Sequence, residues 1–96
     1  MDIQELRQEF IHYLKINYSY AHPEIMASNV LYVYYNDIGV AFNQIFVNEQ
    51  SIKKAKEMLV VHFEEKGRKD PKGHASVHYG CWIKFKEFLD STQHTL

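Results

Sequence analysis

The sequence feature that most constrains the fold is an aromatic stripe between residues 78 and 89. It comprises His78, Cys81, Trp82, Phe85, Phe88 and Leu89. Steps of three and four residues place these side chains on one face of a helix. Three of them are aromatic rings within seven residues, and each ring buries about 150–250 Å². A helix with so much apolar surface requires the remaining segments to pack around it.

The size of the chain predicts one domain that spans residues 1–96. Ninety-six residues can bury about 60–70% of their unfolded surface. No run of eighteen apolar residues is present to span a membrane, and the N-terminus lacks the basic start and apolar core of a signal peptide. The single cysteine, Cys81, excludes an internal disulfide and fits a reducing compartment. We therefore expect a cytoplasmic protein without membrane contact.

Helical periodicity predicts an all-α fold, a compact orthogonal bundle of four to five helices. The predicted helices cover residues 3–16, 24–36, part of 40–46, a segment that Asn48 caps and Gly67 closes, and the aromatic stripe. Asp2 is expected to cap the first helix and Pro23 to begin the second. Residues 30–35 are also rich in strand-forming side chains. Helix is preferred there because no second strand-like run exists to pair with them.

Positive charge is concentrated in the second half of the sequence. Residues 1–50 have a net charge of −4, whereas residues 51–86 hold nine basic and four acidic groups, a net charge of +5. Such a basic block in a nearly neutral chain predicts a surface that meets an anionic partner. The candidate binding residues are Lys53, Lys54, Lys56, Lys66, Arg68, Lys69 and Lys72, with Lys84 and Lys86 as outlying members.

The leading hypothesis for this basic surface is sequence-tolerant binding of duplex DNA. Phosphates reward clusters of Lys and Arg because condensed counterions are released on binding. Gly73 and the N-terminal end of the last helix are also expected to offer backbone N–H groups to a phosphate. The alternative is an ordinary solubilising surface, which runs of charge usually form.

A different class of function is protein interaction or self-association, including a homodimer, through the Tyr-rich second helix. Tyr32 and Tyr35 would then form the partner surface, unless they pack beneath a neighbouring helix. Association through apolar burial persists at high salt, whereas binding through charge weakens. The salt dependence of any complex therefore separates the two hypotheses.

The sequence predicts neither a metal site nor catalysis. His74, His78 and Cys81 would align on a helix, and imidazole and thiolate are good zinc ligands. No convincing fourth ligand accompanies them, and two of the three belong to the aromatic stripe, so core filling and helix capping are preferred. The chain has no glycine-rich phosphate loop, no HExxH motif and no Gly-x-Ser-x-Gly elbow. We therefore expect a binding module without enzymatic activity and without a cofactor.

Two sequence motifs, one near each end of the chain, are similar to motifs of a known protein family. One is a helix opening near Ser76 that continues as His78-x-x-x-Trp82-x-x-Phe85-x-x-Phe88-Leu89, and the other is Phe10-x-x-Tyr13-Leu14. Together they resemble the final and first helices of the N-terminal core-binding domain of tyrosine recombinases, the phage integrase-like proteins. His78 stands where that family usually has tyrosine, and residues 25–48 do not match the family pattern.

The resemblance covers about a third of the chain and implies a SAM-like fold. It also implies a non-catalytic DNA clamp that belongs to a larger recombinase. In those enzymes the nucleophilic tyrosine and its arginine, lysine and histidine partners lie in a separate domain. This chain has two arginines and no His-x-x-Arg box, so its seven tyrosines are interpreted as core or surface residues.

Overall fold

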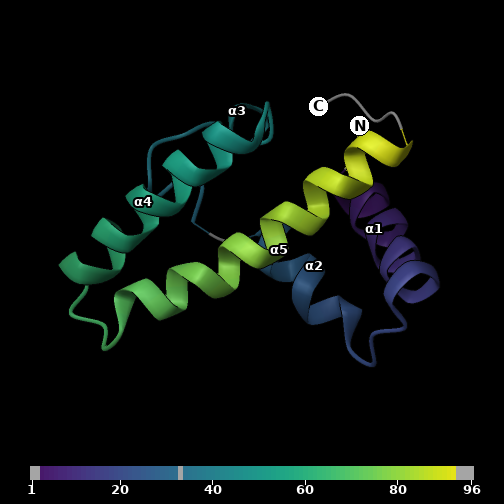
Figure 1. Ribbon diagram of the computed structural model, residues 1–96, viewed down its shortest axis with the longest axis horizontal. Coiled ribbons are helices and arrows are strands. Elements are labelled where there is room, and N and C mark those ends of the chain that lie inside the picture. Colours follow the sequence, from purple (N-terminus) through teal and green to yellow (C-terminus); the bar gives the residue numbers. More distant parts are fainter. Residues whose placement is uncertain (1–2, 33, 93–96) are drawn as a thin grey trace.

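The aromatic stripe lies on the longest helix of the described chain, α5 (Pro71–Thr92), which runs through the middle of the molecule (Figure 1). Trp82, Phe85 and Phe88 are each at most 1% exposed. Rings from other segments meet Phe85 edge-on: Phe10 at 5.1 Å and Phe46 at 4.8 Å between ring centroids. Each such edge-to-face pair stabilises the fold by about 0.5–1.5 kcal/mol beyond its buried area.

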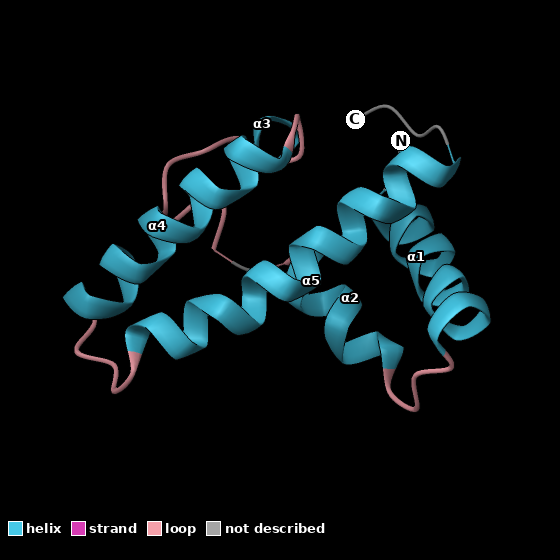
Figure 2. Ribbon diagram, viewed as in Figure 1, coloured by secondary structure: helices cyan, strands magenta, loops and turns pink. Residues whose placement is uncertain are grey.

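The computed structural model describes residues 3–32 and 34–92, and its helices and loops are distinguished in Figure 2. The helices that precede α5 are α1 (Ile3–Tyr18), α2 (Pro23–Leu31), α3 (Phe42–Ile45) and α4 (Glu49–Glu65). No strand occurs among the described residues, which confirms the predicted all-α bundle. In the same described part, no helix is both long and apolar enough to cross a membrane.

Helix α5 is covered from two sides. Helix α4 packs along its N-terminal half, whereas α1 and α2 pack against the remainder (Figure 1). The short helix α3 packs against α4. The buried side chains of the described residues form one contiguous core, so a single hydrophobic cluster joins both sides of α5.

The second helix is shorter than predicted. It ends at Leu31, whereas the periodicity predicts a helix to Asn36. Tyr34 has a φ of 67°, which an α-helix cannot contain, and its ring packs edge-on against Phe63 at 5.0 Å. The chain leaves the helix because Tyr34 is drawn into this tertiary contact. Gly39 adopts the expected left-handed conformation, with φ of 74°, but it closes a turn rather than a helix.

Helix α5 begins earlier than predicted, at Pro71 rather than near Ser76. The Asp70 carboxylate caps it by accepting a hydrogen bond from the Gly73 backbone N–H at 3.1 Å, and Pro71 suits the first helical position. Lys72 and Gly73 therefore lie in the first turn of α5 and not in a basic loop. The expectation that Gly73 offers a free N–H to phosphate is wrong, because Asp70 already occupies it.

The remaining boundaries differ little from the predictions. Helix α1 continues to Tyr18, two residues beyond the expected end. Gly67 closes α4 as predicted: its φ is 71°, and the Gly67 and Arg68 N–H groups bond back to the Glu64 and Phe63 carbonyls in a Schellman arrangement. The predicted cap at Asp2 lies outside the described residues.

Helix α4 begins with the predicted cap at Asn48. The Asn48 side chain accepts from the Ser51 N–H at 2.8 Å, and the Ser51 hydroxyl accepts from the Asn48 N–H at 3.1 Å. Two N–H groups that the helix leaves unbonded are thereby satisfied.

Replacing this cap tests its contribution to stability. Asn48→Ala is expected to lower the free energy of unfolding by about 1 kcal/mol, measured by urea denaturation with an unchanged m-value. Asn48→Asp keeps the acceptor oxygen and serves as the matched variant. Equal loss in both variants would show that the side-chain acceptor does not stabilise α4.

Candidate nucleic-acid interface

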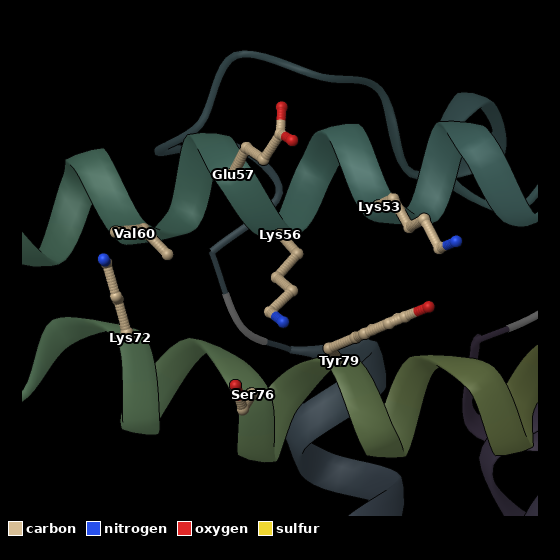
Figure 3. Close-up of a pocket in the computed structure, with 7 residues that line it drawn as sticks. All are labelled: Lys53, Lys56, Glu57, Val60, Lys72, Ser76 and Tyr79. Carbon is tan, nitrogen blue, oxygen red and sulfur yellow. The ribbon is translucent and has the colours of Figure 1, made fainter.

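A groove of about 610 Å³ lies between α4 and α5 (Figure 3). It is lined by Lys53, Lys56, Glu57, Val60, Lys72, Ser76 and Tyr79. We call it the cationic groove, because three of these side chains are lysines and one is acidic. Both helices contribute positive charge to it.

The helical repeat explains why these side chains face each other. Along α4, Lys53, Lys56 and Val60 follow one another at steps of three and four, and along α5, Lys72, Ser76 and Tyr79 do the same. Each set therefore occupies one flank of its helix, beside the buried stripe. Because α4 and α5 are connected by a short loop and pack side by side, the two flanks meet across the groove.

Two of the three groove lysines extend across the groove toward the opposite helix (Figure 3). Lys56 reaches from α4 toward α5, and Lys72 reaches from α5 toward α4, whereas the Glu57 carboxylate points away (Figure 3). The Lys56 Nζ lies 4.9 Å from the centroid of the Tyr79 ring. Within the described residues, the ion pair that the structure contains is Lys86–Asp90, so the groove lysines have no carboxylate partner there.

Three of the predicted binding residues lie outside the groove. Lys54, Lys66 and Lys69 are exposed, and none of them lines the groove. Lys54 follows Lys53 directly and is rotated from it by about 100° around α4. Lys66 is the C-cap residue of α4, and Lys69 lies in the loop that follows. The structure thus unites Lys53, Lys56 and Lys72 and separates them from the other three lysines.

Arg68, the remaining predicted binding residue, is engaged with the fold. Its guanidinium donates to the Tyr34 hydroxyl at 3.1 Å and lies 4.7 Å from the centroid of the Phe63 ring. It does not line the groove. The outlying members are similarly engaged: Lys84 lies over the Tyr18 ring at 4.2 Å, and Lys86 pairs with Asp90 at 2.5 Å.

The two histidines and the cysteine that were weighed as zinc ligands, and assigned instead to core filling and helix capping, pack among aromatic rings. His74 and His78 both contact Phe63, with ring centroids 6.0 Å apart in each case, and Cys81 is buried. Burial raises the pKa of the Cys81 thiol. Among the described residues no group of three or more metal-ligating side chains is placed to hold a metal ion.

The environment of His78 lowers the pKa of its imidazole. Burial is the main cause that lowers its pKa from the ordinary 6.5; Arg68 and His74 add to this, and a hydrogen bond with the Asn29 backbone opposes it. The buried Nδ1 of His78 has no hydrogen-bond partner among the described residues. The charged form of His78 is therefore disfavoured by the fold.

A second polar cluster, which the sequence analysis missed, ties α1 to α5. The Tyr13 and Tyr18 hydroxyls both donate to Glu87 Oε2, the Tyr13 bond at 2.7 Å. These two bonds hold the pKa of Glu87 below its usual range, and the bond to Glu87 is the main cause that raises the pKa of Tyr18 to about 12. No sequence spacing links Glu87 to tyrosines so far away along the chain.

Tyr79, Val60 and Ser76 were also missed as parts of the candidate site. Their signal was present in the sequence, because they continue the flanks that carry Lys53, Lys56 and Lys72 at helical spacing. A comparison with protein-family models, with curated proteins and with solved structures finds no match for this chain. The resemblance to tyrosine recombinases therefore depends on its sequence motifs.

The environment of His78 predicts a pH dependence of stability. Because the pKa of His78 is lower in the folded chain than the ordinary 6.5, its contribution is complete above 6.5 and is lost as the pH falls from there toward the folded value. We expect the free energy of unfolding to decrease as the pH falls below about 6.5. His78→Phe should flatten this dependence, measured by urea denaturation at each pH.

The matched variant for this measurement is His22→Gln, which removes an exposed histidine. It should leave the pH dependence as in the unmodified chain. An unaltered slope in His78→Phe would show that His78 does not couple folding to protonation.

Proposed function

We propose that this chain is a non-catalytic DNA-binding module that contacts backbone phosphates through the cationic groove. The observation that carries the proposal is the convergence of Lys53, Lys56 and Lys72 from two helices on one groove. None of the three forms an ion pair within the described residues, although one acidic residue, Glu57, also lines the groove. Polyanions with regularly spaced phosphates are the partners that such an arrangement favours.

The number of groove lysines sets the expected strength of the salt dependence. Each phosphate neutralised on B-DNA contributes about −0.9 to the slope of log K against log salt concentration. Three lysines therefore correspond to a slope of about −3 if each meets one phosphate. Lys54, Lys66 and Lys69 would raise affinity at longer range without adding contacts of this kind.

The resemblance to the core-binding domain of tyrosine recombinases supports the same proposal and suggests a larger context. The residues that carry the resemblance pack together: Phe10 lies 5.1 Å from Phe85 and 5.3 Å from Phe88 between ring centroids, and Tyr13 lies 5.4 Å from Phe88. In that context the chain would clamp DNA for a catalytic domain elsewhere. DNA binding and a single buried thiol both suit a reducing cytoplasm.

Charge reversal in the groove tests the proposal. We expect the combined substitution Lys53→Glu, Lys56→Glu and Lys72→Glu to abolish binding, because each change replaces an attraction to phosphate with a repulsion. The measurement is fluorescence anisotropy with a labelled duplex that carries a single-stranded tail, over a series of salt concentrations. Circular dichroism establishes that the variant is folded.

The matched control is the combined substitution Lys54→Glu, Lys66→Glu and Lys69→Glu, which changes the net charge equally outside the groove. It should retain binding with a similar salt slope. Equal losses in the two triple variants would overturn the groove as the binding site. The absence of salt-dependent binding by the unmodified chain would overturn the function.

Self-association through α2 is a second candidate function. Tyr34 and Tyr35 are not available to the predicted Tyr-rich surface, since they pack against Phe63 and Phe42. However, Ile25 and Tyr32, seven residues apart, are 64% and 48% exposed. These two side chains form the apolar surface that a partner or a second copy would cover.

This candidate predicts a dimer that persists at high salt, because apolar burial is not screened. Light scattering after size exclusion at low and high salt measures it. Ile25→Glu should return the dimer to a monomer, whereas Glu24→Gln, an exposed change beside it, should not. A monomer under all conditions would eliminate self-association.

A further inference from the structure

We infer that the cationic groove takes a single strand of nucleic acid, with one base stacked on Tyr79. This inference rests on the proposed DNA-binding function and specifies the form of its ligand. It differs from the duplex expected from charge alone, and three features of the groove support it.

The first feature is the direction of the lysine side chains. Lys56 and Lys72 extend across the groove toward the opposite helix (Figure 3), so their ammonium groups face a ligand that enters the groove. A duplex resting on the rim would be served better by lysines that point outward, as the exposed Lys54 does from the outer surface of α4. The groove lysines are therefore positioned to contact the sugar–phosphate backbone of a strand that lies along the groove between α4 and α5.

The second feature is the size of the groove. Its volume of about 610 Å³ lies within the range of about 300–1,000 Å³ that is typical of sites for small molecules and cofactors. Such a volume accommodates a nucleotide unit of one strand but not the width of a duplex. A duplex would leave the interior of the groove, including Tyr79, unoccupied.

The third feature is the apolar floor. Val60 and Tyr79 are half-buried and lie between the lysines, and a site for phosphate alone has no need of an aromatic ring. Proteins that bind single strands combine a positive groove along the backbone with aromatic side chains on which bases stack. The cationic groove offers both groups within one cavity.

Lys56 would move when a base enters. In the free chain its Nζ lies 4.9 Å from the Tyr79 ring centroid. Because both side chains are half-buried, this cation–π contact is not fully desolvated, and the stacking of a base on the same ring is the stronger interaction. A base would therefore replace the ammonium group over the ring. The flexible side chain of Lys56 would then meet the adjoining phosphate.

The test compares a labelled single strand, a duplex of the same sequence and an abasic strand of the same length by fluorescence anisotropy. We expect the single strand to bind more tightly than either of the other probes. Tyr79→Leu should weaken single-strand binding about tenfold and affect the duplex less. Tyr79→Phe keeps the ring and should retain single-strand affinity.

Each outcome decides between the two proposals. Duplex binding equal to or tighter than single-strand binding, with the groove lysines still required, would overturn this inference and leave the DNA-binding function intact. Equal affinity for the abasic strand would overturn base stacking. Displacement of the strand by a mononucleotide at the same concentration would assign the groove to a small nucleotide instead. Binding of none of the probes would overturn both proposals.

The preference of the unmodified chain between strand and duplex does not depend on any substitution. It decides the inference even if Tyr79→Leu fails to fold. Tyr79→Phe removes one hydroxyl and serves as the conservative variant, and a loss of single-strand affinity in it would assign the effect to the hydroxyl and overturn the stacking role.

Discussion

The packing of rings around Phe85 is the interaction on which the rest of the structure depends. Phe10 reaches it from α1, and Phe46, which follows α3, reaches it from the opposite side. This contact fixes the rotation of α5 about its axis. Once that rotation is set, the flank that carries Lys72 and Tyr79 must face α4. The candidate site is thus a consequence of the core, because the same helical phase that buries the rings places the cations beside them.

Periodicity predicts the fold well where one helix face simply meets the core. The helices that contain Phe10, Leu59 and Phe85 follow the expected apolar spacing, and each of these residues is buried. The predictions fail at two boundaries where a single side chain has a stronger tertiary or capping role. Tyr34 lies outside the helix and packs on Phe63. Asp70 caps the start of α5, although the glycine and proline residues around it suggest a loop in the sequence.

The sequence predicts that the candidate site is positively charged and lies in the second half of the chain. It does not predict which of the basic residues line the groove. A count of charges along the sequence does not show in which direction each side chain leaves its helix. It therefore treats Lys54 and Lys56 alike, although they lie on different sides of α4. Helical phase separates them and groups Lys53 with Lys56. Phase within one helix cannot show that Lys72 approaches from α5, since that requires the pairing of two helices. Nor can it show that Arg68 turns toward Tyr34 and Phe63.

The sequence suggests that an anion would meet the N-terminal end of the last helix, whereas the structure offers lysine side chains on the flank of that helix. The N-terminal end of a long helix attracts anions through its free N–H groups and its dipole. At α5 the Asp70 carboxylate accepts from the Gly73 N–H, so a phosphate at this end would meet a like charge. The positive charge of the candidate site lies instead on the flank of α5 beside α4, where Lys72 in the first turn and Tyr79 two turns further along face Lys56 across the groove. Side-chain charges beside an aromatic ring, rather than a helix terminus, define this surface.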